Sequence, residues 1–145
     1  MDFYDDLQVY LSNLAVLNSK LHNLHWNVVG PRFVQLHEFT EEVYEEFFVY
    51  YDEVAEILKM KGEMPLVKLE DYADKATVEE IEAREFDHDE VIEIVLEDLR
   101  EMRSLAVEIR ERADEADEFD VVGEMEEQVD YYNLKIWFLE SMLAG

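Results

Sequence analysis

The residues best suited to chemistry in this chain are histidines and carboxylates on two neighbouring segments. His25 lies on the first segment, and His37, Glu41, Asp52 and Glu56 lie on the second. On the second segment, residues four positions apart pair His37 with Glu41 and Asp52 with Glu56, a spacing that stacks side chains on one helix face. Imidazoles with several carboxylates suit iron(II), with manganese and zinc as competitors. Carboxylates also stabilise iron(III), so this ligand set favours oxidation of the iron that it binds.

The candidate ligands on the second segment share one face, and that face is turned away from the apolar stripe. At about 100° per residue, the four residues fall within an arc of roughly 100°, and the stripe is centred about 150° away. The outward face also carries apolar side chains: Val34, Tyr44, Phe48 and Ala55. A helix with a second, partly apolar face is normally buried on both sides, here most simply by another copy of the chain.

The distance between the candidate ligands along the second segment also requires another copy of the chain. His37 and Asp52 are fifteen positions apart, or about 22 Å in a helix, too far for one metal ion to bridge. Pairing two copies antiparallel about a two-fold axis near residues 45–48 brings His37 of one copy against Asp52 of the other. The two-fold symmetry then makes two identical sites. Each combines His25 and His37, with Glu41 as a further candidate, from one copy and Asp52 and Glu56 from the other.

Two less specific interpretations compete with a catalytic metal site. A histidine beside acids on a helix is usually surface decoration, and acidic pairs at this spacing arise by chance in an acidic chain. The chain could also be a non-catalytic helical assembly or metal buffer that binds iron without turning it over. The shared arc, the partly apolar face and the separation that a two-fold axis resolves together favour the metal site.

Four long segments of helical periodicity position these residues. Their apolar stripes are Phe3, Leu7, Tyr10, Leu14, Leu17, Leu21 and Leu24; Leu36, Val43, Phe47, Tyr50, Val54 and Ile57; Ile92, Val95, Leu99, Met102, Ala106, Ile109 and Ala113; and Val122, Met125, Val129, Tyr132, Ile136, Leu139 and Leu143. Gly30-Pro31 breaks the first segment from the second, which runs from about Phe33 to Lys61. Asp87 is a plausible cap for the third. Four amphipathic helices of this length predict an all-α bundle.

The connections predict the topology of that bundle. A few residues join the first two helices, and the last two are joined near Glu118, so each pair forms an antiparallel hairpin. The stretch from Gly62 to Phe86 is longer than a turn requires and can cross the length of the bundle. It could hold a short helix around Lys68–Ala76, and the capping-box pattern at Thr77 suggests another helical start. Two hairpins joined by one long crossover form the ferritin-like four-helix arrangement, here as one domain over residues 1–145.

Composition bounds the function further. The chain has 145 residues, 38 acidic against 12 basic, and a net charge of −26. Such a field attracts cations and repels nucleic acid, so DNA binding is not expected under ordinary salt. The sequence has no cysteine, which excludes disulfides and thiolate metal sites. No membrane-spanning run and no signal peptide are recognised, so the expected compartment is the cytoplasm.

The sequence also resembles the Dps family of bacterial mini-ferritins. The likeness lies in Leu24 to Phe33 (LHWNVVGPRF), Leu36-His37-Glu38, and Tyr51 to Glu56 (YDEVAE). The family pattern is His-x11-His-x3-Asp-x10-Asp-x3-Glu, and this chain has His25, His37, Glu41, Asp52 and Glu56 at those intervals. The closing Ile136 to Leu139 (IWFL) is similar to the family's last helix, so the likeness spans nearly the whole chain.

This resemblance implies a specific activity and assembly. It implies a hollow shell of twelve subunits, with ferroxidase sites between subunits that oxidise iron(II), preferably with hydrogen peroxide. A stored ferric core would protect the cell from oxidative damage. His25, His37, Asp52 and Glu56 would be the catalytic ligands. Glu41 departs from the family's usual Asp, and its longer arm either reaches the metal directly or alters a second metal position. The family commonly binds DNA through a basic terminal tail, and we expect no such tail in this protein.

Four other features of the sequence bear on the candidate site. Trp26 is either a neighbour of the iron that absorbs stray oxidising equivalents or an interface packing residue. His22, one turn before His25, could orient it or feed protons, although a surface role is favoured. We expect His88 to be structural or exposed. The acidic residues near the last connection either line a cation entry or form a solvated end: Asp114, Glu115, Asp117, Glu118, Asp120 and Glu124.

Overall fold

A computed structural model describes residues 3–144, and within that range the chain folds into helices joined by short turns and one long crossover. In chain order the helices are α1 (Phe3–Asn27), α2 (Phe33–Met60), α3 (Leu69–Lys75), α4 (His88–Glu115) and α5 (Phe119–Ala144). The predicted short helix in the crossover is therefore confirmed as α3. Asp87 caps α4 as expected, because its carboxylate accepts from the Glu90 backbone N–H while the Glu90 side chain accepts from the Asp87 N–H.

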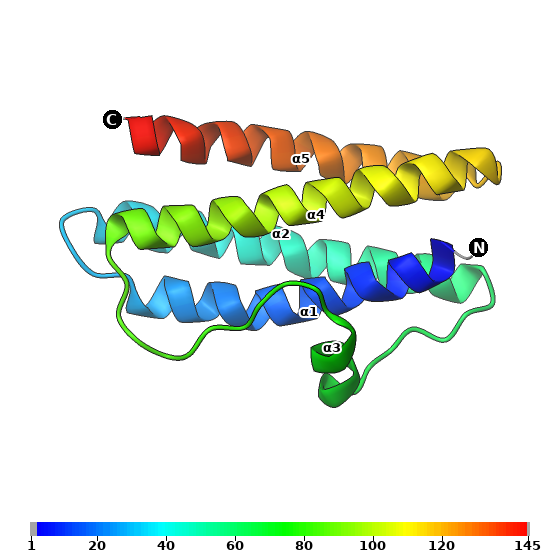
Figure 1. Cartoon of the computed structure of the whole chain (residues 1–145), viewed down its shortest axis with the longest axis horizontal. Coiled ribbons are helices and arrows are strands. Elements are labelled where there is room, and N and C mark those ends of the chain that lie inside the picture. Colours follow the sequence, from blue (N-terminus) through cyan, green and yellow to red (C-terminus); the bar gives the residue numbers. More distant parts are fainter. Residues whose placement is uncertain (1–2, 145) are drawn as a thin grey trace.

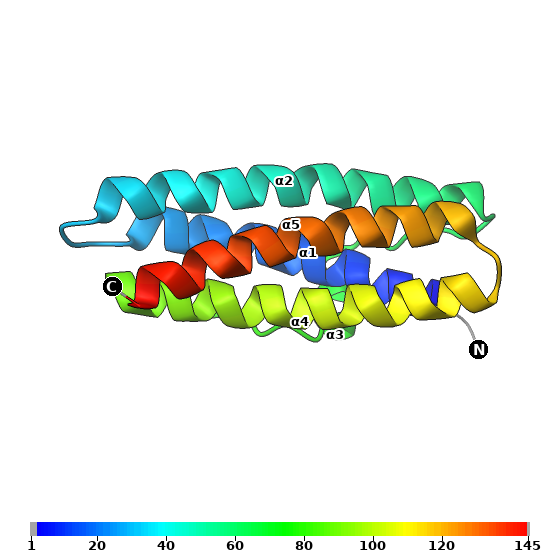
Figure 2. The same cartoon turned by 90° about the horizontal axis from the view of Figure 1, so that it is seen from above.

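The four long helices form an elongated bundle built from two antiparallel hairpins (Figures 1 and 2). The hairpin of α1 and α2 lies beside the hairpin of α4 and α5, and the crossover runs along the bundle from the end of α2 to the start of α4. The α1–α2 turn, the start of α4 and the end of α5 lie at the same end. The ferritin-like four-helix prediction is confirmed.

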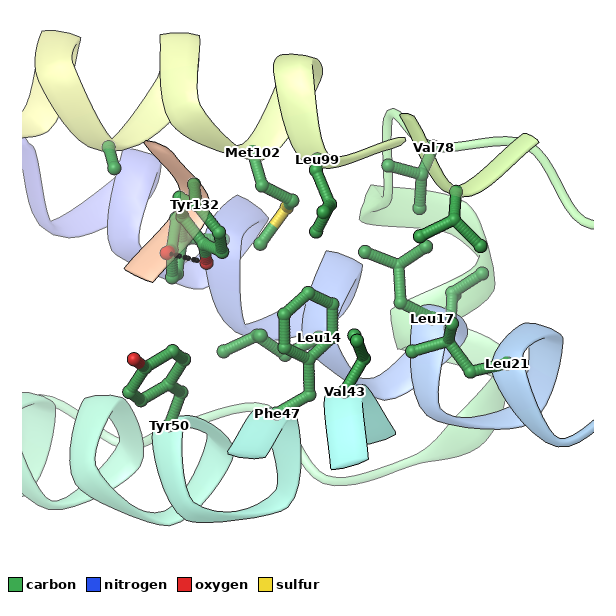
Figure 3. Close-up of a cluster of buried hydrophobic side chains, with 14 of the residues drawn as sticks. Leu14, Leu17, Leu21, Val43, Phe47, Tyr50, Val78, Leu99, Met102 and Tyr132 are labelled. Carbon is green, nitrogen blue, oxygen red and sulfur yellow. Dashed lines mark hydrogen bonds between the residues drawn. The ribbon is translucent and has the colours of Figure 1, made fainter. Parts of the chain in front are cut away.

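Burial of the apolar stripes holds the bundle together. All predicted stripe residues of α1, α2 and α4 are buried. In Figure 3, Leu14, Leu17 and Leu21 of α1 meet Val43 and Phe47 of α2 and the α4 side chains above them. Each fully buried side chain of this size stabilises the fold by roughly 1.5–3 kcal/mol relative to an exposed one.

The predicted stripe of α5 is wrong at its last position. Leu143 is exposed, whereas Val122 and Val129 are half-buried and pack against the core. Gln128 and Lys135 also take core positions, which a search for apolar residues does not find. Burial of these polar side chains is tolerated because each has a partner. The Gln128 amide oxygen accepts from the Tyr10 hydroxyl at 2.5 Å, and Lys135 forms an ion pair with Glu42 across to α2.

The helical start predicted at Thr77 is also wrong. The chain from residue 77 to residue 80 is not helical. The Thr77 hydroxyl donates to Glu101 of α4 at 2.6 Å, and the Thr77 backbone N–H donates to Asn13 of α1 at 2.8 Å. Val78 packs into the core. These contacts with α1 and α4 replace the local capping bonds, so tertiary packing overrides the capping-box pattern.

The end of the bundle that carries His25 is tied down by the crossover. Gly30 has φ +116°, a conformation that suits glycine and lets the chain reverse between α1 and α2. Just before it, the Val29 N–H donates to the Phe86 carbonyl at 2.9 Å, and the Phe86 N–H donates to the Asn27 carbonyl at 3.0 Å. Phe86 is fully buried. The segment between the two histidines is thereby fixed to the start of α4.

A buried ion pair links α1 to α4. Lys20 Nζ lies 2.9 Å from an Asp98 carboxylate oxygen, and both residues are buried. Burial raises the pKa of Asp98 from 3.8 to about 6, although Lys20 opposes that shift. The folded chain therefore holds the Asp98 proton more tightly than the unfolded chain does. The stability that comes from this tighter proton binding is fully present below about pH 4, and it is lost as the pH rises through about 6.

Replacing Lys20 by methionine should therefore destabilise the fold by about 3–5 kcal/mol at pH 7, because it leaves a buried carboxylate without a partner. The double variant Lys20→Met/Asp98→Leu should recover most of the loss. At pH 5, where Asp98 is protonated, the single variant should lose much less. Urea unfolding of metal-free protein at one protein concentration measures all three. Equal losses at both pH values would contradict the assignment.

Candidate metal centre

His25 and His37 face each other across the α1–α2 hairpin. Their rings are stacked, with centroids 3.7 Å apart and planes 16° from parallel. His25 is 6% exposed near the end of α1, and His37 is half-buried in the second turn of α2. A twelve-residue separation along the chain thus becomes direct contact between two imidazoles.

The two histidines are held by reciprocal hydrogen bonds to each other's backbone. His25 Nδ1 donates to the His37 carbonyl at 2.6 Å, and His37 Nδ1 donates to the His25 carbonyl at 2.9 Å. A carbonyl oxygen can only accept, so each Nδ1 carries the proton. Each Nε2 then keeps its lone pair, which is the form of imidazole that binds a metal ion.

A carboxylate completes the cluster within one chain. Glu41 lies one turn after His37, and its oxygen is 4.0 Å from His25 Nε2. One ligand atom from each of His25, His37 and Glu41 lies within 4.8 Å of the other two. Two imidazoles and one carboxylate are the protein ligands of many non-haem iron(II) centres, which keep further positions open.

Burial favours the metal-binding form of His25. It lowers the pKa of His25 below the ordinary value of 6.5, and the bond to the His37 carbonyl and the charge of Glu41 oppose the shift. The neutral ring therefore predominates at pH 7. Metal binding to it needs no proton release, whereas a charged imidazolium would have to lose a proton first.

The structure does not bring Asp52 and Glu56 to this cluster. Both are exposed on α2 and lie several turns beyond Glu41. From His37 to Asp52 the helical rise gives about 22 Å. The three clustered residues therefore form only part of the predicted ligand set. Asp52 and Glu56, the remaining two, lie farther along α2 and out of reach of the cluster.

The surface of α2 between the two halves is partly apolar. Phe48 is 65% exposed, and Val34 and Val49 are also exposed. Tyr44 is half-buried and stacks on His22 at 3.8 Å between ring centroids. Large exposed apolar side chains arranged beside candidate ligands suit contact with another protein surface.

The other residues singled out from the sequence lie as follows. Trp26 is 67% exposed, and its ring is 5.5 Å from that of His22. His22 Nδ1 donates to the Asn18 carbonyl at 2.7 Å. His88 is half-buried, with Nδ1 2.9 Å from Asp89.

The acidic group near the last connection is partly neutralised. Lys61, at the end of α2, forms ion pairs with Glu118 at 2.7 Å and Asp120 at 2.8 Å. Asp114 pairs with Arg110 at 3.8 Å. A role in cation entry stays a prediction.

Sequence reasoning missed Thr40, which contacts both histidines. Thr40 is fully buried on α2, and its hydroxyl lies 3.2 Å from His25 Nδ1 and 3.1 Å from the His37 carbonyl. A polar residue on the inward face of a helix, three positions after a candidate ligand, was the available signal.

Comparisons with known proteins agree with this fold. The model of the ferritin family, described as a ferritin-like domain, matches residues 4–145. A DNA protection during starvation protein of Helicobacter pylori is 31% identical over 144 residues, covering 99% of this chain and all of the relative. The crystal structure of a Dps protein from Bacillus brevis superposes with a TM-score of 0.92 at 30% identity and covers 99% of each chain. Dps from Listeria innocua, soaked with zinc, has a TM-score of 0.93 at 28% identity, covering 99% of this chain and 97% of that one.

Across residues 3–144, no helix combines the length and apolar character needed to span a membrane.

Proposed function

The chain belongs to the Dps proteins of the ferritin-like family, and from that premise we propose that it oxidises iron(II) at centres shared between two subunits. The family makes it an iron-binding mini-ferritin. The proposal adds where the iron is oxidised, by which residues, and in what assembly. The incomplete ligand cluster carries it: His25, His37 and Glu41 converge in one chain, and the two remaining candidate carboxylates lie out of reach on the same helix.

An antiparallel two-fold pairing of α2 with its copy completes the ligand set. It sets the His25–His37 end of one subunit beside Asp52 and Glu56 of the partner subunit. The exposed Phe48 lies near the axis and would be covered by the same contact. Since a two-fold contact is self-complementary, it creates two equal centres per pair. We propose that six such pairs close into a twelve-subunit shell.

In this centre the iron(II) ions are the substrate, and the chain supplies binding and charge. The neutral imidazoles of His25 and His37 bind iron(II) through Nε2. The carboxylates of Glu41, Asp52 and Glu56 favour the more highly charged iron(III), which promotes loss of an electron. Hydrogen peroxide, the expected oxidant, would take one electron from each of two iron(II) ions, and its O–O bond would break to give two hydroxide ions and two iron(III) ions. Zinc and manganese would compete for the same ligands, and a Listeria innocua relative has been soaked with zinc.

Storage and protection follow from oxidation inside a closed shell. Ferric iron would collect in the interior, and removing iron(II) and peroxide together would limit oxidative damage. We do not expect the chain to act by coating DNA, because a subunit charge of −26 repels phosphate. A gel shift at low salt without divalent cations checks this expectation, and retarded DNA would overturn it.

The oxidation assay should separate this function from metal buffering. Purified protein is loaded anaerobically with iron(II), then mixed with peroxide or with oxygen, while ferric absorbance and free iron(II) are followed. We expect oxidation much faster than in protein-free buffer, faster with peroxide than with oxygen, and a native mass near twelve subunits. Binding without faster oxidation would indicate a buffer. A monomer that oxidised iron at full rate would refute the shared centre.

A further inference from the structure

The hydroxyl of Thr40 sits where the two histidine bonds meet. Thr40 is fully buried, and its Oγ1 donates to the Leu36 carbonyl at 2.7 Å, with the His37 carbonyl at 3.1 Å. The same oxygen lies 3.2 Å from His25 Nδ1. A single hydroxyl therefore contacts the ring of one histidine and the backbone of the other.

The hydrogen-bond inventory of this hydroxyl decides its role. A threonine hydroxyl has one proton to donate and two lone pairs. Its proton is directed to helix carbonyls, so a lone pair faces His25 Nδ1. That nitrogen therefore has to carry a proton, and the His37 carbonyl, 2.6 Å away, makes the same demand. In the opposite tautomer, the Nδ1 lone pair would face the lone pairs of the His37 carbonyl, and the Thr40 hydroxyl would have to turn its proton away from the helix carbonyls to donate to it.

We propose that Thr40 is a positioning residue that holds His25 in the Nδ1–H tautomer, with the Nε2 lone pair directed at the metal. The proposal deepens the proposed function and rests on His25 as a ligand. Thr40 also orders the His37 carbonyl that the His25 ring uses. It thus ties the reciprocal pair to α2, although it binds no metal itself. Partners of this kind fix ring orientation, and losing one typically lowers metal affinity about 10–100-fold.

A purely structural role would look different, and Ser12 provides the comparison. Ser12 is also fully buried, and its hydroxyl donates to the Gln8 carbonyl at 2.8 Å, four residues back in α1. It is many residues away from the histidines in the chain. If Thr40 only satisfied its own helix, removing either hydroxyl should have similar consequences.

The test compares Thr40→Val, Thr40→Ser and Ser12→Ala in the assembled, full-length protein. Ring-¹⁵N-labelled histidine in the metal-free assembly reports the tautomer by solid-state NMR. Cobalt(II) titration, followed by its visible absorption, reports affinity at the centre. Because the His37 carbonyl and the His25 ring both lose their contact with the hydroxyl, Thr40→Val should raise the share of the Nε2–H tautomer of His25 and weaken cobalt binding about tenfold. Thr40→Ser, which keeps the hydroxyl, should stay within about twofold of wild type, and Ser12→Ala should leave both readouts unchanged.

Two results would overturn the proposal. One is an unchanged His25 tautomer and an unchanged cobalt affinity in folded Thr40→Val. The other is an equal loss of affinity in Ser12→Ala, which would assign the effect to general loosening of the bundle. The tautomer readout needs no iron, so it separates this inference from the proposed function. Failure of the wild-type protein to oxidise iron(II) would refute the latter alone.

Discussion

Replacing Asp52 or Glu56 by alanine should leave the bundle folded and weaken iron(II) binding by at least about 100-fold. Both side chains are exposed on α2, so their removal opens no cavity in the core. The size of the effect follows from their proposed role. Loss of a residue that merely supports a metal ligand costs about 10–100-fold in affinity, and loss of a ligand should exceed the upper part of that range.

The comparison needs a variant with the same change of charge. Glu97→Ala removes one exposed carboxylate from α4, a helix that carries none of the candidate ligands, and should bind iron(II) like the wild type. Anaerobic titration with iron(II) measures affinity, and helical circular dichroism with native mass shows that the fold and assembly persist. Wild-type affinity in either the Asp52 or the Glu56 variant would remove that residue from the ligand set.

The fold could be predicted from the sequence because its helices obey simple periodicity. In α1, α2 and α4, each apolar stripe residue is buried, since most core positions in those helices are apolar. In α5 the same rule failed at Gln128 and Lys135, whose partners lie on other helices. The capping-box prediction at Thr77 failed for the same reason. The local sequence pattern does not include the contacts that Thr77 makes with α1 and α4.

The candidate site divides along a similar line. Helical spacing puts His37, Glu41, Asp52 and Glu56 on one face of α2 and shows that they cannot meet within a chain. It does not give the ring stacking of His25 on His37. That contact depends on the reversal at Gly30 and on the backbone bonds that Phe86 makes near it. The Nδ1–H tautomers depend in turn on the carbonyls that this reversal presents.

A mixture of two inactive variants should regain about a quarter of wild-type oxidation, which is the sharpest consequence of a shared centre. One variant, His25→Ala/His37→Ala, has no histidine ligands. The other, Asp52→Ala/Glu56→Ala, has no partner-side carboxylates. In a mixed pair, one centre receives both damaged halves and the other receives both intact halves. Random pairing makes half of all pairs mixed, and each mixed pair has one working centre of two, so about a quarter of the centres are restored.

Centres built within one chain could not recover in this way, because neither variant carries a complete set. The two variants are unfolded and refolded together in equal amounts, and native mass spectrometry verifies that both occur in each assembly. Iron(II) oxidation by peroxide is then compared with each variant refolded alone and with a mixture made after folding. Both controls should stay inactive. Each variant refolded alone lacks ligands in every centre, and subunits that were paired before mixing do not exchange partners. If verified mixed assemblies remained as inactive as the controls, the centre would have to be built from a single chain or from a different pairing of α2.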